Sequence, residues 1–325
     1  MTREDMTIHR ARSSDLDNFL ETVPKLLAAH REVVDETALR TGLAVAGLLD
    51  LAVEADELPD SLTWLAAAVE KVAQTSPSIA YALACRFVAW RATRTLGAVE
   101  IPTDLTSGVA TRGGEVVAPL LFDPGHVLVL DQEARRGALV EFDSASATAT
   151  SRSGLRDARL ARIARSSAGR ELAPEAADQA LRELRVLTAA AAAGTAAAAA
   201  DASEAYALER HQFGTNIASF AGLRAILVEM RRQVDETRAL IAGALDAPTD
   251  SALAAEALAT GGRAAVNVSI DAIQVHGGYG YIEEYPVAGL LRDALSLRAR
   301  AGGRRAAVAA VATGRLGDPT HGVRT

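Results

Sequence analysis

Two polar blocks in the second half of the sequence carry the side chains best suited to bind a ligand. The first, residues 204–214, contains Arg210 and Gln212, and the second, residues 273–281, contains Gln274 and the adjacent Gly277 and Gly278. An arginine pairs well with phosphate oxygens, and glycines let a backbone come close to a flat or phosphorylated group. Together these groups suit a nucleotide, with its pyrophosphate near the arginine and its adenine edge near the amides.

Helical periodicity places both blocks at the ends of helices. Apolar residues recur at helical spacing over residues 176–209, 216–246 and 250–275, and a fourth helix is expected from 286 to 315. The first block then lies where the first two of these helices meet, and the second block closes the third. The alanine-rich stretch 189–200 is expected to be the tightly packed middle of a bundle helix. We therefore predict a C-terminal four-helix bundle domain over residues 170–325.

The first half of the chain is expected to form two smaller domains. Residues 1–100 contain apolar stripes at helical spacing and predict an N-terminal helical domain. Residues 101–165 contain short apolar runs separated by Gly, Pro, Asp and Ser, which indicates a shortened middle β domain. Thr106-Ser107-Gly108 is interpreted as a linker before the strands, and the arginine-rich residues 151–175 as a solvated connection. The predicted fold is mainly α with a small central β domain.

Composition and charge exclude several classes of function. The 325 residues are 49% hydrophobic and only 4% aromatic, which is typical of closely packed helices. A formal net charge of −7 gives no electrostatic reason to bind nucleic acid. The charged first residues do not resemble a signal sequence, and residues 189–200 are too short to span a bilayer, so we expect no membrane partner. The single cysteine, Cys85, fits a cytoplasmic protein and is expected to lie in the core.

The motifs, taken in order, resemble one known family. Tyr-Ala-Leu-Glu-Arg-x-Gln-Phe-Gly begins at Tyr206, Gln-x-x-Gly-Gly-Tyr-Gly-Tyr-x-x-Glu-Tyr-Pro begins at Gln274, and Leu-Arg-Asp-Ala begins at Leu291. This succession is similar to the C-terminal helical domain of the acyl-CoA dehydrogenases. The resemblance implies the three-domain fold of that family, FAD as the cofactor, and α,β-dehydrogenation of an acyl-CoA thioester.

The resemblance also implies which residues bind the cofactor. In the family, the matching positions reach across a subunit interface to the pyrophosphate and adenine of FAD. Here these positions are Arg210, Gln212, Phe213, Gln274, Gly277 and Gly278. The alternative for Arg210 is a surface ion pair with Glu204 or Glu209, which would contribute little. The family's Thr-Glu-Pro-x-Ala-Gly-Ser-Asp and Trp-Ile-Thr segments, which hold the flavin ring, have no match, so we do not expect this chain to hold the ring by itself.

The general base of the family is absent from its usual position. Dehydrogenation needs a carboxylate within reach of the substrate α carbon, and the position counted from the Leu-Arg-Asp-Ala motif falls on Ala301. A minority of the family carries the base on the helix before the first block, where the count falls on Leu184, beside Glu183. Glu183 is therefore the candidate base, and an exposed helix carboxylate flanked by arginines is the preferred interpretation. No metal site is expected.

Other polar residues are expected to have structural roles. His276 is interpreted as a packing residue, His126 as a turn residue, and Arg292-Asp293 as a pair that joins helices, as the resemblance implies. The basic cluster within residues 298–305 is interpreted as a solvated helix face.

We therefore favour a short, divergent actinobacterial-type subunit, similar to the smaller chain of the heterotetrameric acyl-CoA dehydrogenases of lipid and steroid catabolism, which serve β-oxidation. Such a base-less chain would complete the FAD site of a second acyl-CoA dehydrogenase-like subunit in an α2β2 assembly. Acyl-CoA is the expected substrate, and a flavoprotein is the possible electron acceptor. The alternatives are a self-sufficient homotetrameric dehydrogenase with Glu183 as base, and a non-catalytic scaffold or acyl-CoA-binding module.

Overall fold

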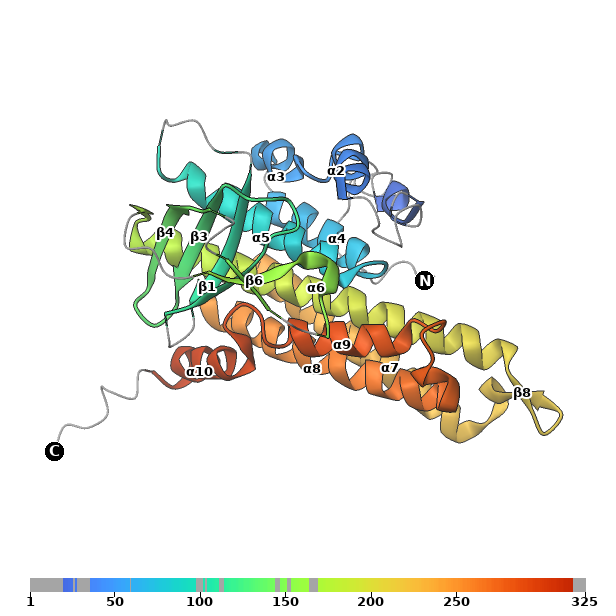
Figure 1. Ribbon diagram of the computed structural model, residues 1–325. Coiled ribbons are helices and arrows are strands. Elements are labelled where there is room, and N and C mark those ends of the chain that lie inside the picture. Colours follow the sequence, from blue (N-terminus) through green and yellow to red (C-terminus); the bar gives the residue numbers. More distant parts are fainter. Residues whose placement is uncertain are drawn as a thin grey trace.

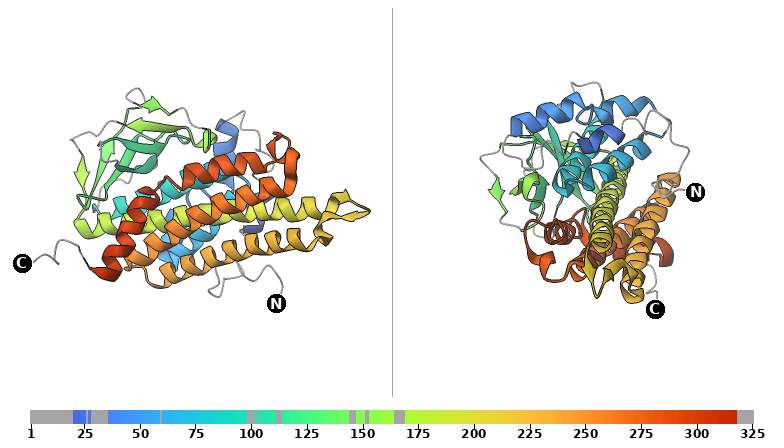
Figure 2. Two further views of the ribbon diagram at one scale, coloured as in Figure 1. Left: turned by 90° about the horizontal axis from the view of Figure 1, so that it is seen from below. Right: turned by 90° about the vertical axis from the view of Figure 1, so that its right-hand side faces the viewer.

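The chain folds into a long helical body with a small sheet at one end (Figure 1). The structure is a computed structural model that describes residues 20–25, 27, 36–58, 60–97, 102, 104–110, 114–143, 147–150, 153–163 and 169–317. The sheet and helix α10 (Gly303–Leu316) lie at one end of the body, and a short hairpin of β8 (His211–Gln212) and β9 (Thr215–Asn216) projects from the other (Figure 2). The mainly helical fold with a small central sheet was predicted from the sequence.

The N-terminal helices pack against the start of the long C-terminal helices. They are α2 (Glu36–Val45), α3 (Leu51–Glu54), the 3-10 helix η2 (Ala55–Glu57), α4 (Ser61–Ala73) and α5 (Pro77–Arg94). Helix α5 begins where the sequence dictates, because the Ser76 hydroxyl accepts a 3.3 Å hydrogen bond from the Ile79 N–H and Pro77 takes the first helical position. Cys85 is buried in α5, as predicted, and this burial raises the pKa of its thiol to about 12.

The sheet has seven strands in the order β5-β6-β2-β1-β3-β4-β7. The strands are β1 (Leu105–Ala110), β2 (Val116–Pro119), β3 (His126–Asp131), β4 (Arg136–Glu141), β5 (Thr148–Ala149), β6 (Leu160–Ile163) and β7 (Arg170–Glu171). Strand β1 pairs in parallel with β3 and antiparallel with β2, so it lies at the centre of the sheet. One face of β1, β2 and β3 is therefore directed at the helical body, where α5 packs against β1.

Two predictions about this region were wrong. Thr106-Ser107-Gly108 is not a linker but the middle of β1, with both hydroxyl-bearing side chains buried. Gly108 is required there because a Cβ atom would come within 2.7 Å of the Val117 carbonyl oxygen on β2. Residues 151–175 are not only a solvated connection, because they include β6, the 3-10 helix η4 (Arg156–Ala158) and β7. Arg162 and Arg170 belong to strands of the sheet, and their side chains are exposed.

His126 is the first residue of β3, immediately after the turn expected there. Its Nδ1 atom is buried and has no hydrogen-bond partner among the described residues.

The C-terminal part is a bundle of long helices. It consists of α6 (Pro174–Glu209), the hairpin, the 3-10 helix η5 (Ile217–Ser219), α7 (Ala221–Asp246), α8 (Ser251–His276), the 3-10 helix η6 (Gly277–Tyr281), α9 (Val287–Leu297) and α10. Asp250 caps α8 by accepting hydrogen bonds from the N–H groups of Ala252 and Leu253. Helix α6 runs through the middle and contacts α4, α5, α7, α8 and α9.

The alanine-rich stretch of α6 lies in the core, as expected. At Gly194 the helix comes so close to α4 that a Cβ atom would clash with the Glu70 carbonyl oxygen. By length and hydropathy alone α6 could cross a membrane, although 83% of its most apolar window is buried inside the protein, as in the core helix of a soluble fold. Its apolar character is thus used in packing against the neighbouring helices.

The fourth predicted helix is two helices, so the single run expected from 286 to 315 was wrong. Helix α9 ends at Leu297 and α10 begins at Gly303. Between them Ala301 has φ +52°, Gly302 +89° and Gly303 +72°, a left-handed conformation that a right-handed helix cannot contain. The chain turns here, and α10 packs across α8.

The sheet is joined to the bundle through Asp293 on α9. One oxygen of its carboxylate accepts a 2.6 Å hydrogen bond from the N–H of Leu155, in the loop before η4. Beside it, a Cβ atom on Gly154 would clash with the Arg292 carbonyl oxygen, so the loop lies directly on α9. Burial is the main cause that raises the pKa of Asp293 to about 6. The Arg-Asp pair therefore joins the middle domain to α9 instead of joining two helices.

Candidate functional site

The two polar blocks meet at the hairpin end of the bundle around an aromatic cluster. Tyr206, near the end of α6, stacks on His276, the last residue of α8, with ring centroids 4.3 Å apart. Tyr285 packs edge-on against both rings. His276 is buried, as expected for a packing residue, and its Nδ1 lies 2.8 Å from the Ala272 carbonyl oxygen. Burial lowers the pKa of His276, which favours its neutral form.

Arg210 lies on the outside of this cluster. Its guanidinium carbon is 5.6 Å from the centre of the Tyr279 ring in η6, a cation–π contact that directs the side chain across the second block. Arg210 makes no ion pair with Glu204 or Glu209 in the described part of the chain, because Glu204 instead accepts a 2.7 Å hydrogen bond from Arg231. Its charge is thus directed to the surface and not neutralised within the cluster.

The other predicted cofactor-binding residues are exposed as well. They are Gln212, Phe213, Gln274, Gly277 and Gly278. Phe213 is 94% exposed at the tip of the hairpin, where its ring touches only Phe220 among the described aromatic residues. A Cβ atom on either glycine would meet nothing within 4 Å, so the backbone there faces open space. The structure brings all six residues to one end of the molecule.

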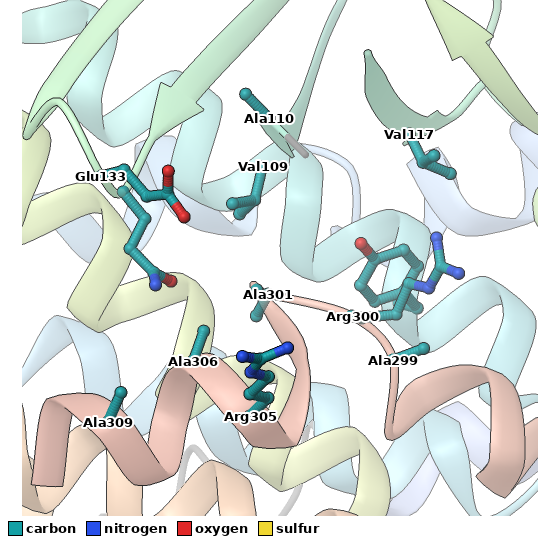
Figure 3. A pocket seen from close by; sticks show the side chains of 13 residues that line it. Val109, Ala110, Val117, Glu133, Ala299, Arg300, Ala301, Arg305, Ala306 and Ala309 are labelled. Atoms are coloured by element: carbon teal, nitrogen blue, oxygen red, sulfur yellow. The ribbon is translucent and has the colours of Figure 1, made fainter. Parts of the chain in front are cut away.

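A cavity of about 580 Å³ lies at the opposite end, between the sheet and the loop that joins α9 to α10 (Figure 3). We call it the sheet-end cavity. Its lining residues are Tyr81, Val109, Ala110, Val117, Gln132, Glu133, Ala299, Arg300, Ala301, Gly302, Arg305, Ala306 and Ala309. Ala301, the position counted for the family's base, therefore lines a cavity of the size that usually holds a small ligand.

The charged side chains of the sheet-end cavity are two arginines and one carboxylate. Arg305 points into the cavity from α10, and Glu133 points into it from the turn between β3 and β4 on the opposite side (Figure 3). Arg300 is only 5% exposed, and its Nε donates a 3.2 Å hydrogen bond to the Ser296 carbonyl oxygen. Its burial contradicts the solvated helix face predicted for residues 298–305. Tyr81 lies beside it, and burial raises the pKa of this phenol.

A second hollow adjoins the cavity and shares Gln132 with it. The Gln132 Oε1 atom accepts a 3.0 Å hydrogen bond from Nη2 of Arg185 on α6. Arg185 is 3% exposed, its Nε has no hydrogen-bond partner among the described residues, and burial lowers its pKa to about 10. Sequence reasoning missed Gln132, Glu133 and Arg185, because the β3–β4 turn and α6 approach each other only in the folded chain.

Glu183 is not the exposed carboxylate that was preferred from the sequence. It is 4% exposed, and its two oxygens accept hydrogen bonds from Arg91 Nε at 2.9 Å and Nη2 at 3.1 Å, and from Gln179 at 2.9 Å. Arg91 belongs to α5, a helix that no local pattern around Glu183 could reveal. The ion pair holds α5 against α6, and Glu183 does not belong to the lining of the sheet-end cavity.

The two ends are too far apart for one chain to combine them. Arg185 and Arg210 both belong to the continuous run of α6 or its C-terminal cap. At 1.5 Å per residue they are separated by about 37 Å along the helix axis. Among the described residues, no group of three or more His, Cys, Asp or Glu side chains is placed to hold a metal ion.

Comparisons with known proteins show which family the sequence and the fold resemble. Residues 175–314 match the family model described as Acyl-CoA dehydrogenase, C-terminal domain. An acyl-CoA dehydrogenase of Bacillus subtilis (strain 168) is 39% identical over 95 residues, which are 27% of this chain and 24% of that protein. The match thus spans about a quarter of the length of this curated relative.

Solved structures extend the likeness to the whole fold. Butyryl-CoA dehydrogenase from Megasphaera elsdenii superimposes with a TM-score of 0.77 at 17% identity, covering 95% of this chain and 100% of that one. The Tcur3481-Tcur3483 steroid ACAD gives a TM-score of 0.77 at 21% identity, covering 93% and 97%. The chain therefore shares with these proteins a fold built from helical, sheet and bundle parts. At the level of sequence, residues 175–314 carry the likeness to the acyl-CoA dehydrogenases, through the C-terminal domain of that family.

The residues present fit one half of the family's cofactor and not the other. At the hairpin end, an exposed arginine, two exposed amides and open glycine backbone suit a dinucleotide tail. At the sheet-end cavity, the loop that would face a flavin ring is Ala301, Gly302 and Gly303, which offers no side-chain hydroxyl or carboxylate. The polar residues at the hairpin end therefore fit a dinucleotide tail, whereas the Ala301–Gly303 loop offers a flavin ring only backbone groups.

Proposed function

We propose that this chain is a subunit of an FAD-dependent acyl-CoA dehydrogenase and that it completes the FAD site of a different, base-carrying subunit. In this assembly FAD would accept the hydride from the acyl-CoA thioester. Arg210 would bind pyrophosphate oxygens, Gln212 and Gln274 would bind polar edges of the dinucleotide, and Gly277 and Gly278 would admit its close approach. The assembly is an α2β2 heterotetramer of a cytoplasmic pathway of acyl-CoA β-oxidation.

The observation that carries this proposal is the exposed Arg210 at the far end of α6 from the chain's own cavity. Arg210 is separated by about 37 Å along the α6 axis from Arg185, which is hydrogen-bonded to the cavity residue Gln132, so Arg210 cannot serve a ligand bound in that cavity. Because no ion pair holds it among the described residues, Arg210 is available to a phosphate brought by another chain. Such a charge-assisted contact contributes about 1.5–3 kcal/mol. The exposed Phe213 beside it also suits contact with a neighbouring subunit.

The composition of the sheet-end cavity supports the second half of the proposal. Ala301 cannot remove a proton, and Glu183 is held by Arg91 outside the cavity lining. A self-sufficient dehydrogenase would have to use Glu133, the one carboxylate that lines the cavity, which is exposed on a turn. The base would instead come from the second subunit, which would also bind the reacting acyl-CoA. The joint designation of the Tcur3481-Tcur3483 steroid ACAD suggests a bulky acyl group as the substrate.

Flavin content tests the proposal directly. The chain is produced alone and together with a dehydrogenase-like chain encoded beside its gene, and flavin absorbance is measured per mole of purified protein. We expect flavin only in the co-purified complex, with Arg210→Gln lowering flavin affinity by about tenfold or more. Arg263→Gln, which removes an exposed arginine in the middle of α8, is the matched control and should retain the flavin.

Two other outcomes would replace the proposal. A yellow, active chain produced alone would identify a self-sufficient dehydrogenase, and loss of activity in Glu133→Gln or Glu183→Gln would then identify its base. A complex that contains no flavin would identify a scaffold or an acyl-CoA-binding module. An electron-acceptor flavoprotein is the expected oxidant of the complete enzyme and can be tested by reduction of an artificial acceptor in its place.

A further inference from the structure

The backbone of Arg210 is fixed on both sides, whereas its side chain rests on a single aromatic ring. The Arg210 N–H donates a 2.9 Å hydrogen bond to the Tyr206 carbonyl oxygen, and the Arg210 carbonyl oxygen accepts one of 2.8 Å from the Ile217 N–H. The guanidinium group makes no ion pair with the described part of the chain, and its carbon lies 5.6 Å from the centre of the Tyr279 ring. The direction of this charge therefore depends on Tyr279.

Tyr279 is itself held in place, although its side chain is 44% exposed. Its carbonyl oxygen accepts a 3.1 Å hydrogen bond from the Ile282 N–H, which closes the turn after η6. The next residue, Gly280, lies so close to the last turn of α8 that a Cβ atom would come within 2.9 Å of the Ile273 carbonyl oxygen. The Tyr279 ring also packs against the Tyr285 ring, with centroids 5.8 Å apart.

The rings form a closed circuit that begins and ends on the last turns of α6. Tyr285 packs against Tyr206, with centroids 5.8 Å apart, and against His276 at 5.5 Å. Tyr206 stacks on His276 and lies four residues before Arg210, which is about one helical turn. The ring that Arg210 contacts is therefore tied, through Tyr285, to the helix that carries Arg210.

An arginine that is held before a ligand arrives binds that ligand more tightly. An exposed arginine side chain has several rotatable bonds, and binding to a phosphate fixes them at a cost in conformational entropy. A cation–π contact that already restricts the side chain reduces this cost. Unlike a carboxylate, an aromatic ring does not neutralise the charge, and the N–H donors stay available for phosphate oxygens. A residue that only holds an arginine can therefore strengthen phosphate binding without contacting the phosphate.

We propose that Tyr279 is a positioning residue, which orients the guanidinium group of Arg210 toward a phosphate-bearing ligand at the hairpin end. This inference rests on the proposed role of Arg210 in binding the pyrophosphate of FAD. It adds a residue that acts through Arg210 and does not itself contact the cofactor. Tyr279 was not among the residues predicted to bind the cofactor, because its contact with Arg210 joins the end of α6 to η6 only in the folded chain.

NMR spectroscopy of the full chain tests the orientation of Arg210 without any flavin. The Nε–Hε signal of Arg210 is assigned by its absence from the spectrum of Arg210→Lys, and its order parameter is measured by ¹⁵N relaxation. We expect Tyr279→Leu to lower this order parameter to that of the exposed Arg263. Tyr279→Phe keeps the ring and should leave the order parameter unchanged. An order parameter that is the same in Tyr279→Leu and in the unmodified chain would overturn the proposal.

Tyr281→Leu is the matched control for the loss of a tyrosine side chain. Tyr281 is 77% exposed in the same helix η6, and its ring packs against no other aromatic ring of the described residues. We expect this variant to leave the order parameter of Arg210 unchanged. An equal decrease in Tyr281→Leu and Tyr279→Leu would show that any change in η6 releases Arg210, which would also overturn the proposal.

Flavin affinity of the co-purified complex separates positioning from direct binding. We expect Tyr279→Leu to weaken FAD binding about two- to fivefold and Tyr279→Phe to bind FAD as the unmodified chain does. When Arg210→Gln is already present, Tyr279→Leu should cause no further loss, because Tyr279 acts through Arg210. Additive losses in the double variant would show that Tyr279 contacts the cofactor or supports the fold, and the positioning role would be wrong.

The two measurements also distinguish this inference from the proposed function on which it rests. If Arg210→Gln leaves FAD binding unchanged while Tyr279→Leu still lowers the order parameter of Arg210, the role of Arg210 in FAD binding fails and its positioning by Tyr279 holds. If Arg210→Gln weakens FAD binding while Tyr279→Leu changes neither the order parameter nor the affinity, the positioning role alone fails.

Discussion

The two ends of α6 differ in the solvent exposure of their arginines. At the hairpin end Arg210 is exposed, lies on an aromatic ring and is surrounded by open backbone. At the sheet end Arg300 is buried in the lining of a cavity that also contains Ala301, and Arg185 is buried beside the adjoining hollow. The first end exposes the residues that were predicted to bind a cofactor, whereas the second end buries these arginines. One helix therefore carries an exposed arginine at one end and a buried arginine at the other.

The largest effect should follow from breaking the ion pair that holds α5 on α6. Glu183→Ala leaves the half-buried Arg91 with Asp56, 3.9 Å away, as its ionic partner, and we expect a loss of about 1.5–3 kcal/mol in the free energy of unfolding. Chemical denaturation measures this loss. If Glu183 were instead the base, Glu183→Gln in the flavin-containing complex would abolish turnover while leaving the unfolding free energy nearly unchanged.

A smaller loss is expected from adding a methyl group in the middle of α6. In Gly194→Ala the new Cβ atom would clash with the Glu70 carbonyl oxygen, and forcing α4 away should cost about 1–3 kcal/mol. Gly243→Ala is the matched control, because its Cβ atom would meet nothing within 4 Å in helix α7. That variant should be stabilised by about 0.4–1 kcal/mol. Equal destabilisation of both would show that α6 and α4 are not in direct backbone contact.

The two ends should respond to pH in opposite directions. The pKa of Asp293 is raised to about 6 in the folded chain, so its contribution to stability is complete below its unfolded value near 3.8 and is lost as pH rises through 6. The pKa of His276 is lowered by burial, so its contribution is present above its usual value of 6.5 and is lost as pH falls. The Asp293 effect should not exceed about 3 kcal/mol.

Amide hydrogen exchange followed at each end separates these two contributions. Protection near residues 155 and 293 should fall between pH 5 and 7, whereas protection near residues 206 and 276 should rise over the same interval, after correction for the intrinsic exchange rate. Asp293→Asn keeps an acceptor for the Leu155 N–H and should remove the pH dependence at the sheet end only. If the pH dependence at the sheet end persisted in this variant, it would come from a titrating group other than the Asp293 carboxyl.

The hairpin end could be predicted from the sequence because its residues are joined by local patterns. Helical periodicity and a glycine pair placed Arg210 and Gln274 at helix ends, and in the fold Arg210 contacts Tyr279 of the second block. The sheet end could not be predicted, because its contacts join residues far apart in the chain. Arg91 and Glu183 are 92 positions apart, and Arg185 and Gln132 are 53 apart. Strand β1 was missed because its Thr106-Ser107-Gly108 segment has the composition of a loop, although the segment is buried at the centre of the sheet.

The unbroken course of α6 also constrains how its sequence can change in length. Within residues 189–193, five consecutive alanines carry no side-chain landmark. Insertion or loss of one alanine would hardly change the amino-acid composition of the helix. Yet it would turn everything beyond it by about 100° and shift it by about 1.5 Å. Arg210 would then face a different direction relative to the sheet. Single substitutions in this stretch change only local packing. A change in length would instead rotate the C-terminal part of α6 about its axis relative to the N-terminal part.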